Sequence, residues 1–478
     1  MEILRPGSWP YVRADSTTPT PQARALAGRS ARADTPRSSH GDWRPAPGRS
    51  DPVRILTRQA GDRLPELVPV RNGRMLASPF AFFRGSAAVM AEDLASTPTS
   101  GIEVQLCGDA HLSNFGGYAS PDRELVFDLN DFDETLPGPW EWDLKRLVAS
   151  LAIAGRDRGF DDRERAAVVS SAAAAYRKAM REFAELGTLQ VWYSRLDARD
   201  VRNRWGAMAG RTASRAFERQ VEKAMKKDNA RALSRLTHLV DGVPRMNSDP
   251  PLLVPVAELL RHDELVMFEG VVEETLRGYR RSLPAGRRQL IEQFRYAETA
   301  RKVVGVGSVG TRAWVVLMLG SSEDDPLFLQ LKEARQSVLA RAAGKSRFAQ
   351  EGQRVVVGQQ LLQASSDIFL GWSRVTAMDG VVRDFYFRQL WDWKLSADVG
   401  RQSPRIMAVY GQMCGWVLAR GHARTGDRIA IAAYLGRGDA FDDAMTSFAE
   451  LYADQNERDY ERFMDAAREK RIDVTLNV

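Results

Sequence analysis

Two short runs of polar residues, each at the end of a strand-like segment, constrain this chain more than any other feature. Residues 102–106 alternate apolar and polar side chains, as a half-buried strand does, and lead into 107–114, Cys-Gly-Asp-Ala-His-Leu-Ser-Asn. A second strand-like segment leads into the end of 125–133, Leu-Val-Phe-Asp-Leu-Asn-Asp-Phe-Asp. Two adjacent strands would therefore deliver five carboxylate and amide side chains to one place: Asp109, Asn114, Asp128, Asp131 and Asp133.

Carboxylates held this close repel one another, so they need a cation, shared protons or strong hydrogen bonds. Oxygen ligands of this kind suit a divalent metal ion such as Mg²⁺. The alternative is an acidic turn in which each Asp or Asn caps a nearby backbone group, which is common for any single residue of these types. The clustering of five such residues favours a site that binds metal and activates a hydroxyl group.

The two runs resemble the catalytic half of the protein-kinase-like phosphotransferases, in particular the branch of aminoglycoside and choline kinases. That branch carries His-Gly-Asp-x-His-x-x-Asn, and this chain matches it at Gly108, Asp109, His111 and Asn114, with Cys107 in place of the first His. The resemblance implies that Asp109 is the catalytic base and that Asn114 is a magnesium ligand.

The same resemblance implies a metal ligand in the second run. Residues 131–133, Asp-Phe-Asp, stand where kinases have Asp-Phe-Gly, so Asp131 is the expected ligand, and Asp128 is a competing alignment. Asp143 resembles the structural Asp that follows in the same branch. His111 is expected to position the catalytic loop, because no second His lies at a spacing suited to metal binding.

A kinase-like enzyme also needs a nucleotide-binding lobe, and the candidate lies downstream. Residues 304–310 read Val-Gly-Val-Gly-Ser-Val-Gly, and strand-like runs at 313–319 and 327–332 follow them. Glycines let a backbone approach phosphates closely, and a lysine at the end of the last run could reach the phosphates as a point charge. The residues expected to hold the nucleotide are Gly305, Gly307, Ser308, Gly310 and Lys332.

The order of these segments distinguishes between folds. A dinucleotide-binding fold runs from a strand through the glycines into a helix, whereas here the glycines lead into a strand, as in kinases. A plain hairpin turn is the simpler alternative for the glycines. A helix at 347–364 and strands at 367–372 and 384–390 would complete a small lobe of five strands and one helix.

A kinase lysine usually pairs with a glutamate on the helix of the small lobe. Glu351 follows Lys332 by nineteen residues, a separation compatible with such a pair, and Glu333 and Gln359 are competing candidates. An exposed Glu351 with no role at the site is an equally acceptable interpretation.

Because the catalytic run precedes the glycines, we predict an α+β chain with a circularly permuted protein-kinase-like fold, in which a mostly helical large lobe carries a small antiparallel-sheet nucleotide lobe. Helices are expected at 256–302, 403–423 and 440–470. The expected units are a disordered tail rich in Arg, Pro and Ser at 1–52, a helical lobe at 53–290 with the catalytic segment 102–143, a nucleotide lobe at 291–394, and C-terminal helices of the large lobe at 395–478.

From about residue 51 to the C-terminus the chain also resembles a bacterial family, domain of unknown function twenty-two fifty-two. Cys107 fits the pattern of that family. The family implies a place near the kinase-like superfamily and no known substrate. The stretches that carry the resemblance are 74–85, 105–116, 130–135, 329–334 and 366–372.

Composition bears on where in the cell the protein is expected and on what it is expected to bind. The 478 residues include no apolar run long enough to span a membrane and no apolar signal segment, and the two cysteines suit a reducing cytoplasm. Residues 1–50 carry four of the six net positive charges, so the remainder is nearly balanced and nucleic acid is not an expected partner. Arg84 and His422 lie in apolar helical runs, where a solvated or capping role is expected and substrate binding is the alternative.

These features predict an ATP- and Mg²⁺-dependent phosphotransferase that acts on an unknown acceptor, which we expect to be a small molecule. Two alternatives stay open on the same fold: a nucleotide-binding pseudokinase or scaffold, and an enzyme that transfers a nucleotidyl group. A metal-dependent hydrolase would use the Asp cluster but would leave Lys332 and the glycines without a role.

Overall fold

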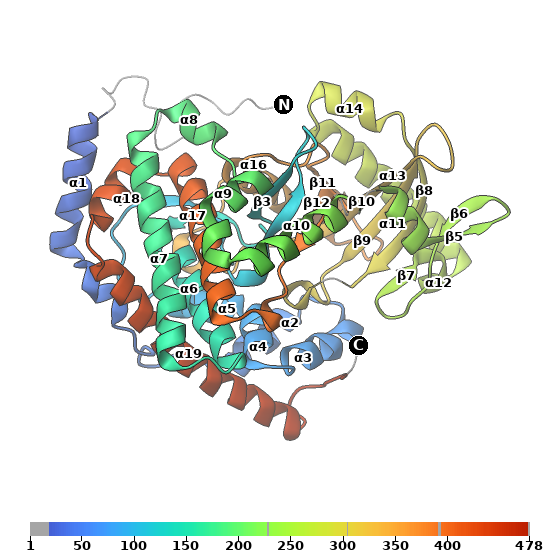
Figure 1. Ribbon diagram of the computed structural model, residues 1–478. Coiled ribbons are helices and arrows are strands. Elements are labelled where there is room, and N and C mark those ends of the chain that lie inside the picture. Colours follow the sequence, from blue (N-terminus) through green and yellow to red (C-terminus); the bar gives the residue numbers. More distant parts are fainter. Residues whose placement is uncertain (1–18, 227–228, 304, 391–392, 477–478) are drawn as a thin grey trace.

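The computed structural model describes residues 19–226, 229–303, 305–390 and 393–476, and it combines many helices with antiparallel sheets. Figure 1 shows a helical lobe on one side of the molecule and a sheet lobe on the other. The α+β class expected from the sequence is therefore confirmed. Among the described segments, no helix is both long enough and apolar enough to cross a membrane.

Four long helices form the core of the helical lobe: α6 (Trp140–Asp157), α7 (Asp162–Glu185), α17 (Pro404–Thr425) and α19 (Ala440–Arg468). Helix α6 is buried from residue 140 to residue 155, because the other three helices pack around it. Helices α7 and α17 approach closely at Gly415, where an added Cβ would lie 2.5 Å from the carbonyl oxygen of Ala172. The predicted helices at 403–423 and 440–470 are confirmed.

The segment before residue 52 is part of this lobe. Helix α1 (Pro21–Asp34) packs against α18 (Arg428–Leu435), and the 3-10 turn η1 (Arg37–Gly41) packs against α19. His40 and Trp43 are buried, and Arg49 forms ion pairs with Asp93 and Asp459. The prediction of a disordered tail is therefore wrong from residue 19 onwards, whereas residues 1–18 lie outside the described residues. Packing against helices some four hundred residues away orders this segment.

The sheet lobe contains six antiparallel strands in the order β11-β12-β10-β9-β8-β7. Alternate residues of β9 pack on opposite faces, as expected for a strand that is covered on both sides. Val316 and Met318 join the cluster that contains Tyr279, whereas Val315 and Leu317 join the cluster that contains Leu236. The strands are β7 (Leu253–Pro255), β8 (Arg295–Lys302), β9 (Ala313–Leu319), β10 (Pro326–Ala334), β11 (Gly371–Thr376) and β12 (Val382–Gln389).

This lobe differs from the five strands and one helix expected. Strand β8 ends the region predicted to be helical up to residue 302, and β7 adds a sixth strand from before the predicted boundary at 291. Helices α11 (Asn229–Leu236) and α13 (His262–Ser282) contact the sheet, so the lobe begins before that boundary too. Helix α16 (Glu351–Leu362) is the predicted small-lobe helix, shortened at both ends, and β11 begins four residues later than predicted.

Two small sheets flank the 107–114 run and join it to the rest of the molecule. Strand β1 (Glu103–Leu106) pairs with β4 (Leu136–Pro139), and β2 (Phe115–Ala119) pairs with both β3 (Leu125–Leu129) and β13 (Leu395–Ser396). The remaining elements are α2 (Pro52–Ala60), α3 (Val68–Met75), α4 (Pro79–Gly85), α5 (Ala87–Leu94), α8 (Thr188–Tyr193), α9 (Ala198–Ala209), α10 (Arg211–Met225), β5 (Thr237–Val240), β6 (Val243–Met246), α12 (Val256–Leu259), α14 (Ala285–Ile291), α15 (Ala340–Ala343) and the 3-10 turns η2 (Pro65–Leu67), η3 (Leu112–Asn114), η4 (Val306–Ser308) and η5 (Val399–Arg401).

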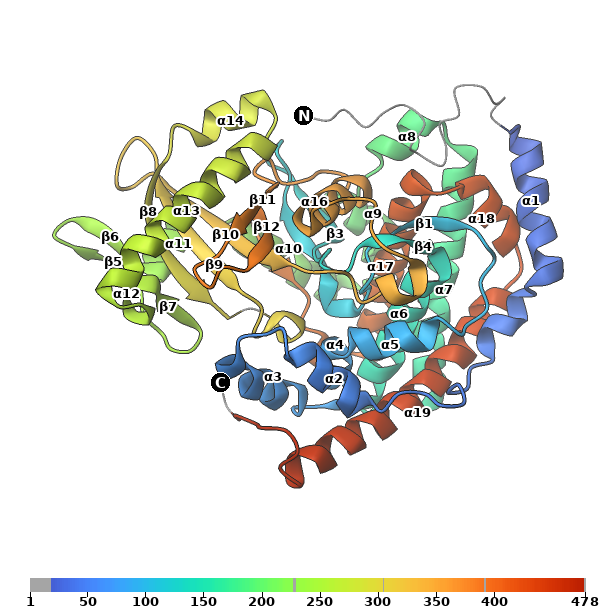
Figure 2. The ribbon, with the colours of Figure 1, turned by 180° about the vertical axis from the view of Figure 1, so that it is seen from behind.

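Helices α2 to α5 lie along the base of the molecule, below the junction of the two lobes (Figure 2). Helix α4 contacts both α6 of the helical lobe and η4, which follows β8 of the sheet lobe. The segment that contains α4 is therefore held by both lobes.

Candidate active site

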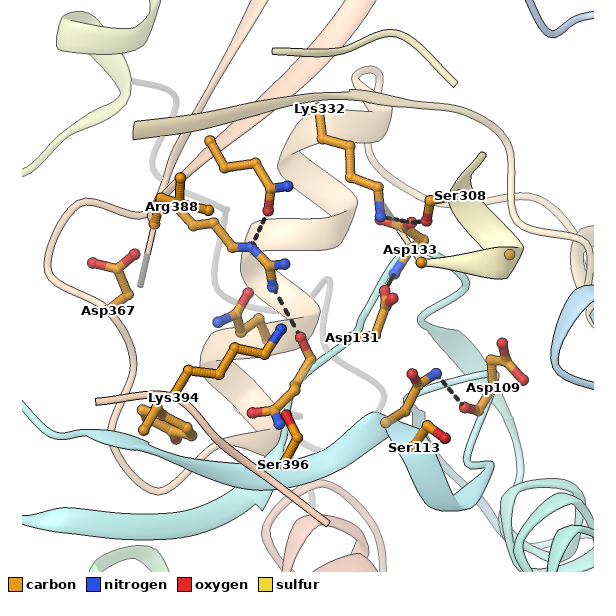
Figure 3. Close-up of a pocket in the computed structure, with 18 of the residues that line it drawn as sticks. Asp109, Ser113, Asp131, Asp133, Ser308, Lys332, Asp367, Arg388, Lys394 and Ser396 are labelled. Carbon is orange, nitrogen blue, oxygen red and sulfur yellow. Dashed lines mark hydrogen bonds and ion pairs between the residues drawn. The ribbon is translucent and has the colours of Figure 1, made fainter. Parts of the chain in front are cut away.

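A cavity of about 640 Å³ lies where the two lobes meet. It brings together polar residues that are far apart in the sequence, and Figure 3 shows Asp109, Asp131, Asp133 and Lys332 around one space. Lys332 and Asp131, which are far apart in the sequence, both line this cavity. The predicted site residues that line the cavity are Asp109, His111, Asn114, Asp131, Asp133, Gly305, Gly307, Ser308 and Lys332.

Helix α6 holds the backbone of the 107–114 run through Asp143. Both carboxylate oxygens of Asp143 accept backbone hydrogen bonds, from the amides of Cys107 at 2.8 Å and Gly108 at 3.0 Å. Gly108 has φ of +88°, and an added Cβ would lie 2.2 Å from the carbonyl oxygen of Glu134, so this turn requires glycine. Asp143 therefore has the structural role that its resemblance implied.

Asp109 is the carboxylate at the centre of this run. Its Oδ1 accepts a hydrogen bond from Nε of Arg146 at 2.8 Å, and its Oδ2 lies 3.7 Å from Nε2 of His111. Burial raises the pKa of Asp109, and the charge of Arg146 opposes that rise. With Oδ1 occupied by Arg146, Oδ2 is the oxygen better placed to accept a proton from a molecule in the cavity.

His111 and Asn114 fix the loop around Asp109. Nδ1 of His111 accepts a hydrogen bond from the amide of Ser113 at 3.2 Å, and burial, together with Arg146, lowers the pKa of His111 well below its ordinary value. A neutral His111 is thus a loop-positioning residue. Nδ2 of Asn114 donates to the carbonyl oxygen of Asp109 at 2.9 Å, which orients the Asn114 side chain and keeps its Oδ1 as an acceptor.

The hairpin of β2 and β3 delivers the second run to the cavity. Lys332, on β10, forms an ion pair with Asp133 across 199 residues of sequence. The two oxygens of Asp133 also accept hydrogen bonds, from the Tyr386 hydroxyl at 2.7 Å and from the Ser308 hydroxyl at 3.3 Å. The Asp131 carboxylate accepts a hydrogen bond from the amide of Asp133 at 3.2 Å.

These contacts set the charges in the cavity. Burial lowers the pKa of Lys332, but the attraction of Asp131 and Asp133 is larger and holds that pKa above its ordinary value. Burial likewise raises the pKa of Asp133, and Lys332 and Tyr386 outweigh it and hold that pKa below its ordinary value. Lys332 is therefore a cation and Asp133 an anion at neutral pH.

The glycine turn connects β8 with β9; the strand after the glycines was predicted, whereas the strand before them was not. Gly307 approaches the helical lobe, because an added Cβ there would lie 3.4 Å from the carbonyl oxygen of Arg84. Gly310 has φ of +84° and packs against the side chain of Arg63, outside the residues that line the cavity. Gly310 was predicted to contact a nucleotide, but its position shows that it supports the turn. Gly305, Gly307 and Ser308 do line the cavity.

Two further assignments require correction. Asp128 is 1% exposed, pairs with Arg420 at 2.5 Å and lies outside the cavity lining, so it is a buried structural carboxylate and not a metal ligand. Glu351 pairs with Arg354 on the same helix, whereas Lys332 pairs with Asp133, so the expected pair of Lys332 with Glu351 is replaced. Of the competing alignments, Asp131 is the one that reaches the cavity.

Two arginines that help to build the site, Arg354 and Arg388, were not predicted from the sequence. Arg354 is 2% exposed and donates to the backbone carbonyls of Asp133 at 2.9 Å and Thr135 at 2.7 Å. Arg388 donates to the carbonyl oxygen of Asn130 at 3.0 Å. An arginine inside an apolar helical or strand run was the available signal for both. His422 is fully buried and bonded to Tyr176 at 2.8 Å, so the solvated role expected for it is wrong.

The donor set decides which metal ion the site could hold. Within the described residues, no three His, Cys, Asp or Glu side chains are grouped so as to bind a metal by themselves. Mg²⁺ does not need such a cage, because it is usually held by one or two protein oxygens together with substrate phosphates and water. Asp131 and the Oδ1 of Asn114, both in the cavity lining, fit that kind of site.

Comparison with known proteins identifies the family of the chain. A family described as "uncharacterized protein conserved in bacteria (DUF2252)" matches residues 63–466. No curated protein and no solved structure matches the chain. Because the match covers most of the sequence, including every segment that lines the cavity except Gln59, the chain belongs to this bacterial DUF2252 family.

Proposed function

We propose that this protein is an ATP- and Mg²⁺-dependent phosphotransferase with a circularly permuted kinase-like arrangement. The observation that carries the proposal is the convergence of two segments on one cavity: the catalytic run with Asp109, and the strand–glycine turn–strand–lysine strand order that ends at Lys332. A hairpin separates the catalytic run from Asp131, which is the spacing the kinase resemblance requires.

Charge supports a polyphosphate ligand. Eight Lys and Arg side chains line the cavity against five Asp and Glu side chains, so the cavity as a whole favours an anion. Lys332 and Arg388 would hold phosphate oxygens, and the glycine turn would let its backbone approach them. Asp131 and Asn114 would hold Mg²⁺, which when bound neutralises charge on the phosphate oxygens.

Asp109 then acts as the base for the acceptor. In the proposed reaction the acceptor oxygen bonds to the γ-phosphorus, and the bond from that phosphorus to the bridging oxygen of ADP breaks with its electron pair on ADP. The acceptor proton passes to Oδ2 of Asp109. Arg146 keeps Asp109 oriented through Oδ1, and Asp133 holds Lys332 in place. Much of such catalysis is positioning and charge neutralisation.

Binding of ATP in the presence of Mg²⁺ is the first test. Replacing Lys332 with Ala removes a charge-assisted donor, so the dissociation constant measured by calorimetry should rise about 10- to 100-fold. Asp131→Asn should weaken only the Mg²⁺-dependent part of binding. Lys178→Ala, on an exposed position of α7, is the matched control and should bind like the wild type. A wild-type protein that binds no ATP would contradict the proposal.

A further inference from the structure

One wall of the cavity has no role in the phosphoryl transfer proposed above. Helices α2 to α4 and the loop after α2 supply this wall through Gln59, Arg63, Arg74 and Arg84. No carboxylate belongs to these helices' part of the lining, so the wall is basic. Arg74 is the first residue and Arg84 the last but one of the 74–85 stretch, one of the longest stretches that resemble the bacterial family.

Arg84 has an unsatisfied donor near Asp109; Arg63 of the same wall also has a buried Nε with no partner among the described residues, but its Nη1 donates to the Val309 carbonyl oxygen. The Nε of Arg84 is buried and has no hydrogen-bond partner among the described residues. Burial lowers the pKa of Arg84, and the charge of Asp109 opposes this shift, so the guanidinium lies within the electrostatic reach of Asp109. An unpaired buried donor is costly, and reorientation of the guanidinium toward an anion would satisfy it.

The neighbouring Arg146, in contrast, has hydrogen-bond partners for its guanidinium. Its guanidinium lies 3.7 Å from the Phe83 ring centroid and donates to Asp109 and to the Phe83 carbonyl oxygen at 2.7 Å. The charge of Asp109 is thereby largely balanced by Arg146. An anion on the Arg84 side would therefore meet little repulsion from Asp109.

The wall also lies on the acceptor side of the site. Lys332 and Arg388, which are proposed to hold phosphates, belong to β10 and β12 of the sheet lobe, whereas Arg74 and Arg84 belong to α3 and α4, and Arg84 lies within the electrostatic reach of Asp109. Gly307 abuts the Arg84 backbone, so the end of α4 meets the glycine turn where the terminal phosphate of a bound nucleotide would point. A molecule held on this wall would thus stand between Asp109 and that phosphate.

We propose that this wall is the acceptor subsite and that the acceptor is a small molecule bearing an anionic group, a phosphate or a carboxylate, which Arg84 binds with the help of Arg74. The proposal rests on the proposed function, because the role of Asp109 as base defines which end of the cavity receives the acceptor. A guanidinium can bind either group through two parallel hydrogen bonds.

Calorimetric titration with inorganic phosphate and, separately, with succinate tests the subsite. The titrations use the full chain carrying Lys332→Ala, which removes one of the competing cations proposed to hold the nucleotide. We expect saturable binding of at least one probe, weakened 10-fold or more when Arg84→Gln is added. Adding Arg58→Gln instead should leave binding unchanged, because Arg58 is a 58% exposed arginine on α2 that pairs with Glu92. The probe that binds more tightly identifies the anionic group of the acceptor.

A second measurement separates this subsite from the nucleotide site. With Lys332 intact, the affinity for a non-hydrolysable ATP analogue and Mg²⁺ should change less than twofold on Arg84→Gln. If Arg84→Gln unfolds, Arg84→Lys keeps the charge and should lose part of the probe binding. Probe binding that does not depend on Arg84 would overturn the inference, as would a loss of ATP-analogue affinity equal to the loss of probe affinity. A wild type that binds probe through Arg84 but binds no ATP analogue would refute the proposed function and leave the anion subsite standing.

Discussion

Asp109 and Asp133 are two carboxylates of one cavity whose pKa values shift in opposite directions. Burial raises the pKa of Asp109 in spite of Arg146, whereas Lys332 and Tyr386 overcome burial and lower the pKa of Asp133. Groups whose environments separate their pKa values in this way are suited to different tasks. Asp109 suits the acceptance of a proton, and Asp133 suits a permanent ion pair with Lys332.

Asp109→Asn keeps the size of the side chain and removes the proton acceptor. We expect ATP affinity and the melting temperature to stay near the wild-type values, while turnover falls about 10²- to 10⁴-fold, the usual range for a positioned general base. In the wild type, turnover should increase as pH rises through a pKa above the ordinary Asp value, because the base must be ionised. Steady-state kinetics across pH would measure both effects. An unchanged turnover in the variant would exclude Asp109 as the base.

Glu134 offers a test of the electrostatics that is independent of activity. Burial raises its pKa from 4.5 to about 7. As pH rises from 4.5 to 7, the unfolded chain ionises Glu134 while the folded chain keeps it neutral, so folded-state stability is lost across this window. Relative to Glu134→Gln, the wild type should lose about 3 kcal/mol of unfolding free energy over that range. Urea denaturation at several pH values measures this difference, and the exposed Glu185→Gln should show none of it.

At the scale of elements, α16 anchors the loop that carries Asp131 and Asp133. Arg354 reaches from this helix to three backbone carbonyl oxygens, including that of Arg335 at 2.6 Å. This arrangement differs from the expected contact of a helix glutamate with the strand lysine. The helix thus acts on the backbone of the loop, and Asp133 acts on Lys332.

Replacing Arg354 with Met keeps an apolar stem and removes the guanidinium that these carbonyls share. Buried carbonyl groups that lose a charged donor should cost about 2–4 kcal/mol of unfolding free energy. ATP binding should weaken as well, because the loop carries Asp131. Chemical denaturation and calorimetry measure the two effects, with the exposed Gln360→Ala on the same helix as the control. Full stability of Arg354→Met would show that the loop does not depend on α16.

Helices with long apolar periodicity, such as α17 and α19, were predictable from the sequence because their pattern is local. The site was predictable in part for a similar reason: Asp109, Asn114, Asp131 and Lys332 stand at the ends of strand-like runs. The roles of Asp128 and Glu351 were not predictable, because they depend on Arg420 and Arg354, partners that only the folded chain identifies. Strand β8 was missed because its Ala-, Arg- and Glu-rich sequence has helical character, and its neighbours β7 and β9 determine its conformation.

At the scale of the whole molecule, the N-terminal segment that contains Trp43 and Arg49 packs against the C-terminal helix α19. Trp43 is 6% exposed, and its ring centroid lies 5.0 Å from that of Tyr452 on α19. Arg49 adds ion pairs to Asp93 on α5 and to Asp459 on α19. Composition alone predicted disorder here, because the apolar residues are few, but Trp43 is buried against an element some four hundred residues away.

Trp43→Ala tests the contribution of this packing to stability. Loss of a buried tryptophan leaves a cavity, so the free energy of unfolding should fall by about 3–5 kcal/mol. Leu26→Ala in α1, where the side chain is 58% exposed, should change it by less than about 0.5 kcal/mol. Thermal or chemical denaturation compares the two variants. Equal effects would contradict the assignment of Trp43 to the core.

In the proposed reaction the terminal phosphate of ATP is transferred to an acceptor within the cavity between the lobes. This transfer is tested most directly by incubating the protein with Mg²⁺, a metabolite extract and ATP labelled at either the α- or the γ-phosphorus, beside Asp109→Asn as the control. We expect the γ-label to move to an acceptor in the wild type, the α-label to stay with the nucleotide, and the variant to transfer neither. Movement of the α-label would instead indicate nucleotidyl transfer, and bound ATP with neither label moved would indicate a scaffold; either result would contradict phosphoryl transfer by this protein.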